Sequence, residues 1–249
     1  LQITQYGNHE HLMLVRDVTR LYQLEQMRKD FVANVSHELR TPLTVIAGYL
    51  ETLLDNVEAV NPRWLRALQQ MQQQGGRMQN LLNDLLLLAK LEATDYPSDN
   101  QPVAVDLLLL SIKNDAQALS AERHHRISLE ADPHLRLKGS ETELRSAFSN
   151  LVFNAVKYTP DEGEIRIRWW ADDQGAHLTV TDTGLGIEAR HLPRLTERFY
   201  RVDSSRASNT GGTGLGLAIV KHVLLRHRAR LEISSVLGHG STFTCHFAP

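Results

Sequence analysis

A histidine and a glutamate stand side by side at His37 and Glu38, in a stretch whose pattern predicts a long helix. A neutral imidazole nitrogen can attack phosphorus, and an ordinary histidine pKa of about 6.5 keeps much of the ring neutral at pH 7. Glu38 can accept a hydrogen bond from the other ring nitrogen, fix the tautomer and take up the proton released by the attack. The pair therefore predicts a phosphoryl acceptor, although an isolated pair of this kind is also common on the surface of bundle helices.

Thr41 and Pro42, which follow this pair, bear on the same chemistry. Thr41 follows His37 by four residues, so its side chain is one turn along the same helix face. Its hydroxyl can orient a water molecule toward a phosphorylated histidine. Pro42 lacks a backbone N–H and removes the hydrogen bond to the carbonyl of Glu38, so we expect a bend beside the histidine.

The second half of the chain carries polar residues suited to a nucleotide. Asn150 and Asn154 are one turn apart on a predicted helix, so both side chains point the same way. Asn154 can offer its carbonyl oxygen to Mg²⁺, which prefers hard oxygen ligands. Lys157 and Tyr158 follow within reach of phosphates and sugar. Taken without the motifs below, these residues fit a polar surface face equally well.

An acidic residue ends a predicted strand at Asp182, and Gly184 and Gly186 follow it. A carboxylate in this position can accept a hydrogen bond from the adenine amino group, and the glycines let the backbone approach the ring. An Asp-Thr-Gly turn is common by itself, so its weight comes from its neighbours.

A glycine-rich segment opens a further predicted helix with the residues Gly212, Thr213, Gly214, Leu215 and Gly216. Free backbone N–H groups at a helix start can face phosphates. The segment is not a Walker A motif, because the Gly-Lys-Ser/Thr ending is absent, and no strand precedes it as in a Rossmann fingerprint.

The stretch before that segment is polar and lacks periodicity over residues 204–209, which predicts a lid over the nucleotide. Arg198 and Arg201 flank Phe199 and Tyr200. One arginine can meet the γ-phosphate, or the pair can belong to a solvated face.

These residues need elements to position them. Apolar residues recur at three- and four-residue steps over 21–54, which is typical of an amphipathic helix. Asn61 and Pro62 supply a cap and a first-turn proline for a second helix. Two long antiparallel helices cannot bury both apolar stripes, so we expect a second copy to complete a dimeric four-helix bundle. Residues 19–94 are thus predicted to be an all-α helical hairpin.

The rest of the chain mixes helical and strand patterns. Residues 95–103 are rich in turn formers and predict a linker. Residues 104–249 predict an α+β sandwich, with helices near 105–119, 141–157 and from 214, and strands near 126–130, 135–137, 164–170, 176–182, 231–235 and 242–247. Residues 1–18 alternate loosely and predict the last hairpin of an upstream domain.

Composition excludes several classes of protein. The chain has 249 residues, 42% of them hydrophobic, enough for one or two domains with a real core. A net charge of -2 gives no general attraction to nucleic acid or to a membrane surface. Cys245 is the single cysteine, which excludes an internal disulfide and fits a reducing compartment. No apolar run is long enough to span a membrane and the chain begins with Leu1, so we expect a soluble piece of a longer protein, with any membrane anchor upstream.

Taken together, the motifs resemble those of sensor histidine kinases of two-component systems. The resemblance covers residues 19–249 through the segments called the H, N, G1, F and G2 boxes, here 36–42, 150–157, 182–186, 197–201 and 212–216. It implies a dimerisation and phosphotransfer hairpin followed by an ATP-binding domain of the gyrase/Hsp90/histidine kinase/MutL (GHKL or Bergerat) type. His37 would then take the γ-phosphate of ATP, with Mg²⁺, and pass it to an aspartate of a response regulator. Glu38 and Thr41 match positions used by the family to dephosphorylate that regulator.

A closer similarity is to the phosphate-regulon group of this family. It rests on residues 31–35, 43–45 and 195–203, including Thr196 where the family usually has phenylalanine. This implies a homodimer that is the cytoplasmic portion of an inner-membrane sensor, with a PhoB-like response regulator as partner and no direct contact with nucleic acid. Residues 17–19 resemble the exit from a PAS sensor domain.

Two other classes of protein share some of these features. A clamp-type ATPase of the gyrase/Hsp90/MutL kind uses similar Asn, Asp-Gly and Gly-rich elements, but it has no need of His37 and Glu38 on a preceding helix. A non-catalytic dimer scaffold would be expected to have lost motif residues, and every expected one is present.

Overall fold

The computed structural model describes residues 2–6, 10–14, 39, 43–53, 62–93, 99–202 and 213–249. Four predicted site residues lie outside these ranges: His37, Glu38, Thr41 and Gly212. Residues 204–209, predicted to form the lid, and the bend predicted at Pro42 also lie outside them.

The N-terminal part holds a short hairpin and two helical stretches. β1 (Gln2–Tyr6) pairs antiparallel with β2 (Glu10–Leu14), which agrees with the hairpin predicted there. Residues 43–53 are helical, and α2 (Pro62–Ala93) begins at the predicted first-turn proline. At 32 residues α2 is roughly 48 Å long and continues through Gly75 and Gly76. Within the described ranges, no helix combines the length and apolar character needed to cross a bilayer.

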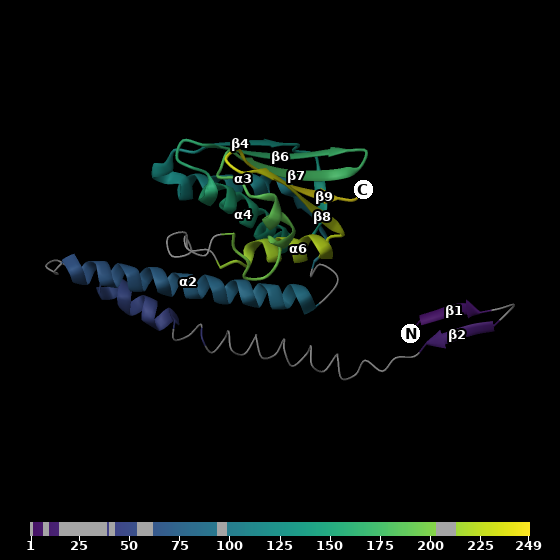
Figure 1. Ribbon diagram of the computed structural model, residues 1–249, viewed down its shortest axis with the longest axis horizontal. Coiled ribbons are helices and arrows are strands. Elements are labelled where there is room, and N and C mark those ends of the chain that lie inside the picture. The colour runs from purple at the N-terminus through teal and green to yellow at the C-terminus, as the bar shows by residue number, and fades with distance from the viewer. Residues whose placement is uncertain are drawn as a thin grey trace.

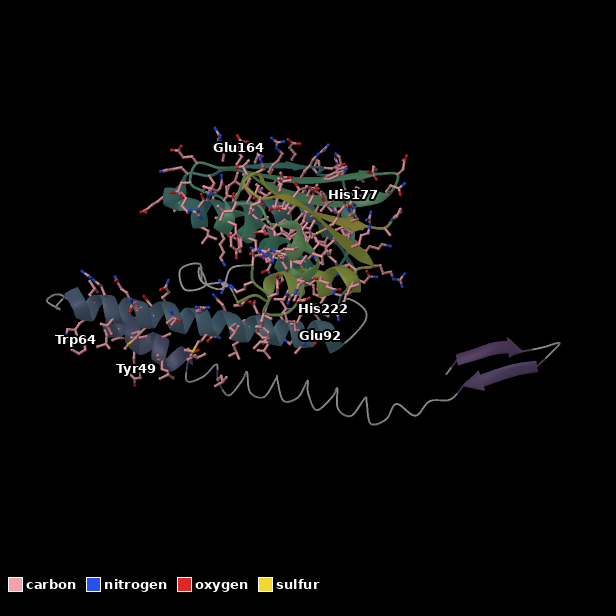
Figure 2. The ribbon with its side chains drawn as sticks, viewed as in Figure 1. Tyr49, Trp64, Glu92, Glu164, His177 and His222 are labelled. Carbon is pink, nitrogen blue, oxygen red and sulfur yellow. The ribbon has the colours of Figure 1, made fainter. Side chains whose placement is uncertain are left out.

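The helices leave a row of large apolar side chains in solvent. Tyr49 and Trp64 are 69% and 67% exposed, and Figure 2 shows both on the side of the helices that faces away from the sheet. Five more apolar residues of these helices are exposed, namely Val45, Ile46, Leu53, Met71 and Met78, and so is Leu39. A row of exposed large apolar side chains on neighbouring helices is typical of an interaction surface.

The C-terminal part is built on a five-stranded sheet in the order β4-β6-β7-β9-β8. β4 and β6 are parallel, and every other neighbouring pair is antiparallel. β3 (Gln101–Ala104) and β5 (Arg136–Gly139) form a separate two-stranded antiparallel ladder. The sheet strands are β4 (Arg126–Ala131), β6 (Glu164–Asp172), β7 (Gly175–Asp182), β8 (Ala229–Val236) and β9 (Gly240–Phe247).

Three helices cover one face of this sheet: α3 (Val105–Ser120), α4 (Glu141–Tyr158) and α6 (Gly216–Arg226). Figure 1 shows the sheet as one layer and the helices as the next, with α6 between α4 and α2. Alternate residues of β6 point into the core, since Ile165, Ile167 and Trp169 are at most 1% exposed. Phe247 packs edge-on against both Phe148 and Trp169. The predicted order of a helical hairpin and then an α+β sandwich is confirmed.

Several element boundaries differ from the predicted ones. β3 overlaps the end of the segment predicted to be a linker, residues 95–103. The strand was missed because Pro102 removes a ladder donor and obscures the strand pattern at this edge position. α6 begins at Gly216 rather than Gly214, since Gly214 has φ +74°, outside the helical region. Two short 3₁₀ helices, η1 (Ala121–Arg123) and η2 (Ala189–Arg194), were not predicted.

Candidate nucleotide-binding site

Helix α4 carries the first group of predicted site residues along one edge. Asn150, Asn154 and Lys157 are half-buried, and Tyr158 is 44% exposed. The opposite face of α4 is packed into the core through Leu144, Ala147, Phe148, Leu151, Val152, Ala155 and Val156. Because that packing fixes the rotation of the helix, the polar edge is held at the rim of the domain.

The corner after β7 presents a buried carboxylate. Asp182 is 7% exposed, and the backbone N–H of Gly184 donates to its Oδ1 at 2.8 Å. Burial raises the pKa of Asp182 above its usual range, while backbone hydrogen bonds from Gly184 and Ser241 oppose that rise. The side chain is thus a buried hydrogen-bond acceptor.

This corner is joined to the end of α4. The N–H of Leu185 donates to the carbonyl of Tyr158 at 3.2 Å. A Cβ added at Gly184 would lie 2.7 Å from that same carbonyl oxygen, and one at Gly186 would collide with the carbonyl of Val236. Only glycine allows the backbone to pass this close, so both positions need the residue that the sequence supplies.

The described part of the glycine-rich segment, residues 213–216, also lies next to α4. The carbonyl of Gly214 accepts a hydrogen bond from the N–H of Phe199 at 2.9 Å. Leu215 is fully buried, and Gly216 lies against Asn150, since an added Cβ would be 3.2 Å from its Cγ. The start of α6 is therefore beside α4, with the Asp182 corner at the other end of the same edge.

Positive charge gathers at the end of α4. The pKa of Lys157 is lowered to about 8, first by desolvation and then by the nearby charges of Arg201 and Arg77. Burial raises the pKa of Tyr158, and Arg201 opposes that rise. The Lys157 ammonium is 4.9 Å from the centre of the Tyr158 ring. The positive charges of Lys157, Arg201 and Arg77 repel one another, and a polyphosphate beside them would turn this repulsion into attraction.

Helix α2 binds two of the residues that were predicted to meet phosphates. The Thr213 hydroxyl donates to Asp84 Oδ2 at 2.8 Å, and Arg198 forms an ion pair with Glu92. Glu92 also lies 3.4 Å from Nε2 of His222, and Figure 2 shows these two side chains together at one end of α2. Burial raises the pKa of Asp84, with the Thr213 hydrogen bond opposing. In the structure, Asp84 and Glu92 of α2 thus occupy the hydroxyl of Thr213 and the guanidinium of Arg198.

Most of the predicted nucleotide residues are thus brought to one place. Asn150, Asn154, Lys157 and Tyr158 line α4, and the remaining described ones border it from the Asp182 corner, the F-box turn and the start of α6. Sequence reasoning missed the α2 side chains Arg77, Asp84 and Glu92. The only available signal was a charged residue, Asp84, interrupting a leucine-rich stretch of the helix.

The chemistry of this edge fits a nucleotide with its metal ion. Asp182 offers a buried acceptor for a base, and Gly184 and Gly216 let the backbone lie directly against Tyr158 and Asn150. Lys157 and Arg201 offer positive charge for phosphates. Asn154 supplies an amide oxygen of the kind that Mg²⁺ accepts.

Two family models match the chain. The His Kinase A (phospho-acceptor) domain matches residues 27–94, and the model described as histidine kinase-, DNA gyrase B- and HSP90-like ATPase matches residues 139–249. Together they account for well over half of the sequence.

The chain is also similar to full-length proteins. It is 88% identical over 247 residues to the phosphate regulon sensor protein PhoR of Pseudomonas aeruginosa, covering 99% of this chain and 56% of that protein. It is 43% identical to the PhoR protein of Haemophilus influenzae, covering 98% of this chain and 57% of that protein. The chain thus spans just over half the length of these relatives.

Among solved structures, it resembles full-length ShkA in complex with AMPPNP, with a TM-score of 0.72 and 27% identity over 88% of this chain and 47% of that one. The histidine kinase AdeS of Acinetobacter baumannii, at 20% identity and a TM-score of 0.60 over 85% of this chain and 97% of that one, shares the fold.

Proposed function

The chain belongs to the family of sensor histidine kinases, and we propose that it is the kinase core of a phosphate-regulon sensor. In this proposal it transfers the γ-phosphoryl group of ATP to His37 and then to an aspartate of a PhoB-like response regulator. The identity to the two PhoR proteins supports the regulon, and the matched domains support the chemistry.

The observation that carries the proposal is the single edge formed by α4, the Asp182 corner and the start of α6. It combines a buried carboxyl acceptor, glycines in contact with neighbouring backbone and side chains, and a lysine whose pKa is lowered to about 8. A base at one end and a polyphosphate at the other would satisfy each of these groups. In this arrangement Asp182 binds adenine, Tyr158 lies beside the sugar, and Lys157, Arg198 and Arg201 bind phosphates.

The transfer step follows from the residue types at His37 and Glu38. The neutral imidazole nitrogen forms a bond to the γ-phosphorus while the bond from that phosphorus to the β,γ-bridging oxygen breaks, and ADP leaves with the electron pair. Glu38 accepts the proton of the second ring nitrogen. Asn154 would hold Mg²⁺, whose charge neutralises phosphate oxygens. We also propose a separate dephosphorylating reaction, in which Thr41 orients the water molecule that hydrolyses the aspartyl phosphate of the regulator and free phosphate leaves.

The contacts with α2 suggest that the structure is a docked state. Thr213 and Arg198 are bonded to Asp84 and Glu92, so these two groups must leave α2 before they can bind phosphates. We propose that kinase activity requires this opening and that an upstream sensor controls it.

The exposed apolar face of the helices supports a homodimer. Tyr49 and Trp64 are about two thirds exposed, and a second hairpin would bury them in a four-helix bundle. The match to the His Kinase A domain points the same way. The remaining length of the PhoR relatives leaves room for a sensing region, and we propose that the full protein is anchored in the inner membrane by such a segment.

Phosphotransfer to a regulator tests the proposal. The chain is labelled with γ-labelled ATP and Mg²⁺, and then mixed with a PhoB-like regulator, with that regulator lacking its acceptor aspartate, or with a regulator of another system. We expect label to move rapidly to the first protein alone. Equal transfer to the unrelated regulator would contradict the phosphate-regulon assignment, and no labelling of the chain would contradict the kinase.

A further inference from the structure

We propose that Arg123, in η1, is a positioning residue for the nucleotide site, because its guanidinium holds the C-terminal turn of α4. The inference rests on the proposed function, since it concerns the turn that carries Asn154, Lys157 and Tyr158. Arg123 does not belong to any of the sequence motifs and is more than thirty residues away from this turn in the chain.

The last carbonyls of a helix have no partner within the helix. Arg123 supplies partners at the end of α4. Its Nη1 donates to the carbonyl of Val156 at 2.8 Å and to that of Lys157 at 3.5 Å, and its Nη2 donates to the carbonyl of Thr159. The positive charge at a helix C-terminus is also favourable for the helix dipole. One side chain thus binds three carbonyls of the turn, those of Val156, Lys157 and Thr159.

Neighbouring residues hold in place these contacts of Arg123 with the end of α4, which we call the Arg123 clamp. The carbonyl of Arg123 accepts the N–H of Glu162 at 2.8 Å, which ties η1 to the loop after α4. His125 Nε2 is 3.1 Å from the carbonyl of Thr159, so this nitrogen carries the proton and donates. His125 Nδ1 lies 2.9 Å from the Ser120 hydroxyl, which can donate to it. Arg123 of η1 and His125, which directly precedes β4, therefore bind the same turn, and Ser120 of α3 holds His125 in place.

The clamped turn is in direct contact with the adenine side of the site. The carbonyl of Tyr158 accepts the N–H of Leu185 and lies against Gly184. If the turn unwinds, Tyr158 no longer supports the Asp182 corner, and Lys157 is no longer held near Arg201. Binding of a nucleotide would then have to restore the turn first.

The carbonyl contacts matter more than the ion pair that Arg123 also makes. Its Nε is 2.9 Å from Asp161 Oδ1, but the Asp161 side chain is 72% exposed, and exposed pairs contribute little. A lysine could not replace the guanidinium, because a single ammonium lacks the planar set of donors that spans separate carbonyls. The clamp therefore needs arginine specifically.

The test compares Arg123→Ala and Arg123→Lys with the native chain in titrations with a non-hydrolysable ATP analogue and Mg²⁺. If the turn is formed for only about a tenth of the time in Arg123→Ala, the apparent Kd rises about tenfold. Arg123→Lys should be intermediate. The rate of phosphorylation at saturating ATP should stay near the native rate, because the bound state is already ordered. Amide exchange should accelerate at residues 155–159 and not in the first turns of α4.

Arg145→Ala is the matched control. Arg145 is on the same helix and bonds Ser111 at 3.1 Å and Asp115 at 2.9 Å, but it is three turns before the clamped end. We expect native Kd and native exchange at residues 155–159 in this variant. An equal rise in Kd in both variants would overturn the inference by showing general weakening of α4, and so would an unchanged Kd in Arg123→Ala. If Arg123→Ala does not fold, a raised Kd in Arg123→Lys supports the inference and an unchanged Kd in Arg123→Lys overturns it. A native chain that binds no nucleotide would instead overturn the proposed function.

Discussion

Removing Asp84 should strengthen nucleotide binding. In the docked state its carboxylate accepts the Thr213 hydroxyl at 2.8 Å, at the start of the glycine-rich segment proposed to bind phosphates. A phosphate and the carboxylate compete for the same hydroxyl, and two negative groups repel one another. Asp84→Ala therefore removes a competitor rather than a ligand.

The size of the effect follows from this contact. A hydrogen bond to a charged group contributes about 1.5–3 kcal/mol. The same burial that raises the pKa of Asp84 shows that its charge is partly desolvated, which offsets some of that gain. A net contribution of about 1 kcal/mol corresponds to roughly a fivefold decrease in Kd. Asp84→Asn keeps an acceptor oxygen and should give a smaller decrease.

The assay is calorimetric titration of each variant with a non-hydrolysable ATP analogue at fixed Mg²⁺ and salt. Asp115→Ala serves as the control, because it removes the same charge from an exposed pair with Arg145 on another helix. Glu92→Gln, which removes the counter-charge of Arg198, should act in the same direction as Asp84→Ala. The two effects need not add, since both contacts belong to one docked interface.

An unchanged or weaker affinity in a folded Asp84→Ala chain would refute the competition. It would mean that Thr213 does not need to leave α2 for the nucleotide to bind. The same decrease in Kd for Asp115→Ala would show that the effect comes from the change in net charge and not from the contact with Thr213.

Three further predictions concern single groups. Nucleotide affinity should fall as pH rises from 7 to 9, because Lys157, with a pKa of about 8, loses its positive charge in this range. Lys157→Arg keeps the charge and should make the affinity nearly independent of pH in the same titration. Glu143→Ala should lower the free energy of unfolding, measured in urea, by about 3–5 kcal/mol, because it removes the buried carboxylate that lies 2.9 Å from Arg226. Glu130→Ala, the control, breaks an exposed 3.8 Å pair and should lower it by less than about 1 kcal/mol. Similar losses in the two variants would contradict this prediction. Cys245 is fully buried and its pKa is raised to about 12, so a maleimide should modify it only upon unfolding, and rapid modification of the native chain would be inconsistent with the buried thiol.

Regular elements with local signals were predictable from the sequence. The cap and proline at residues 61–62 placed the start of α2, and the alternation of β6 and β7 placed two central strands and the corner at Asp182. The spacing of Asn150 and Asn154 correctly predicted that both would lie along one edge of a helix.

Features that depend on distant residues were not predictable in this way. Asp84 and Glu92 look like ordinary polar positions of a bundle helix until α2 is seen against Thr213 and Arg198. The clamp by Arg123 joins segments more than thirty residues apart and has no period or motif. Such contacts arise from tertiary packing, which local propensity does not encode.

The most direct test of the central claim is the chemical form and position of the label after incubation with γ-labelled ATP and Mg²⁺. The account predicts protein-bound label that is labile in acid and stable in base, and that is lost in His37→Gln while nucleotide binding is kept. Label retained by His37→Gln, or release of free phosphate with no labelled protein, would contradict the assignment of His37 as the phosphoryl acceptor, and the second result would favour a clamp-type ATPase.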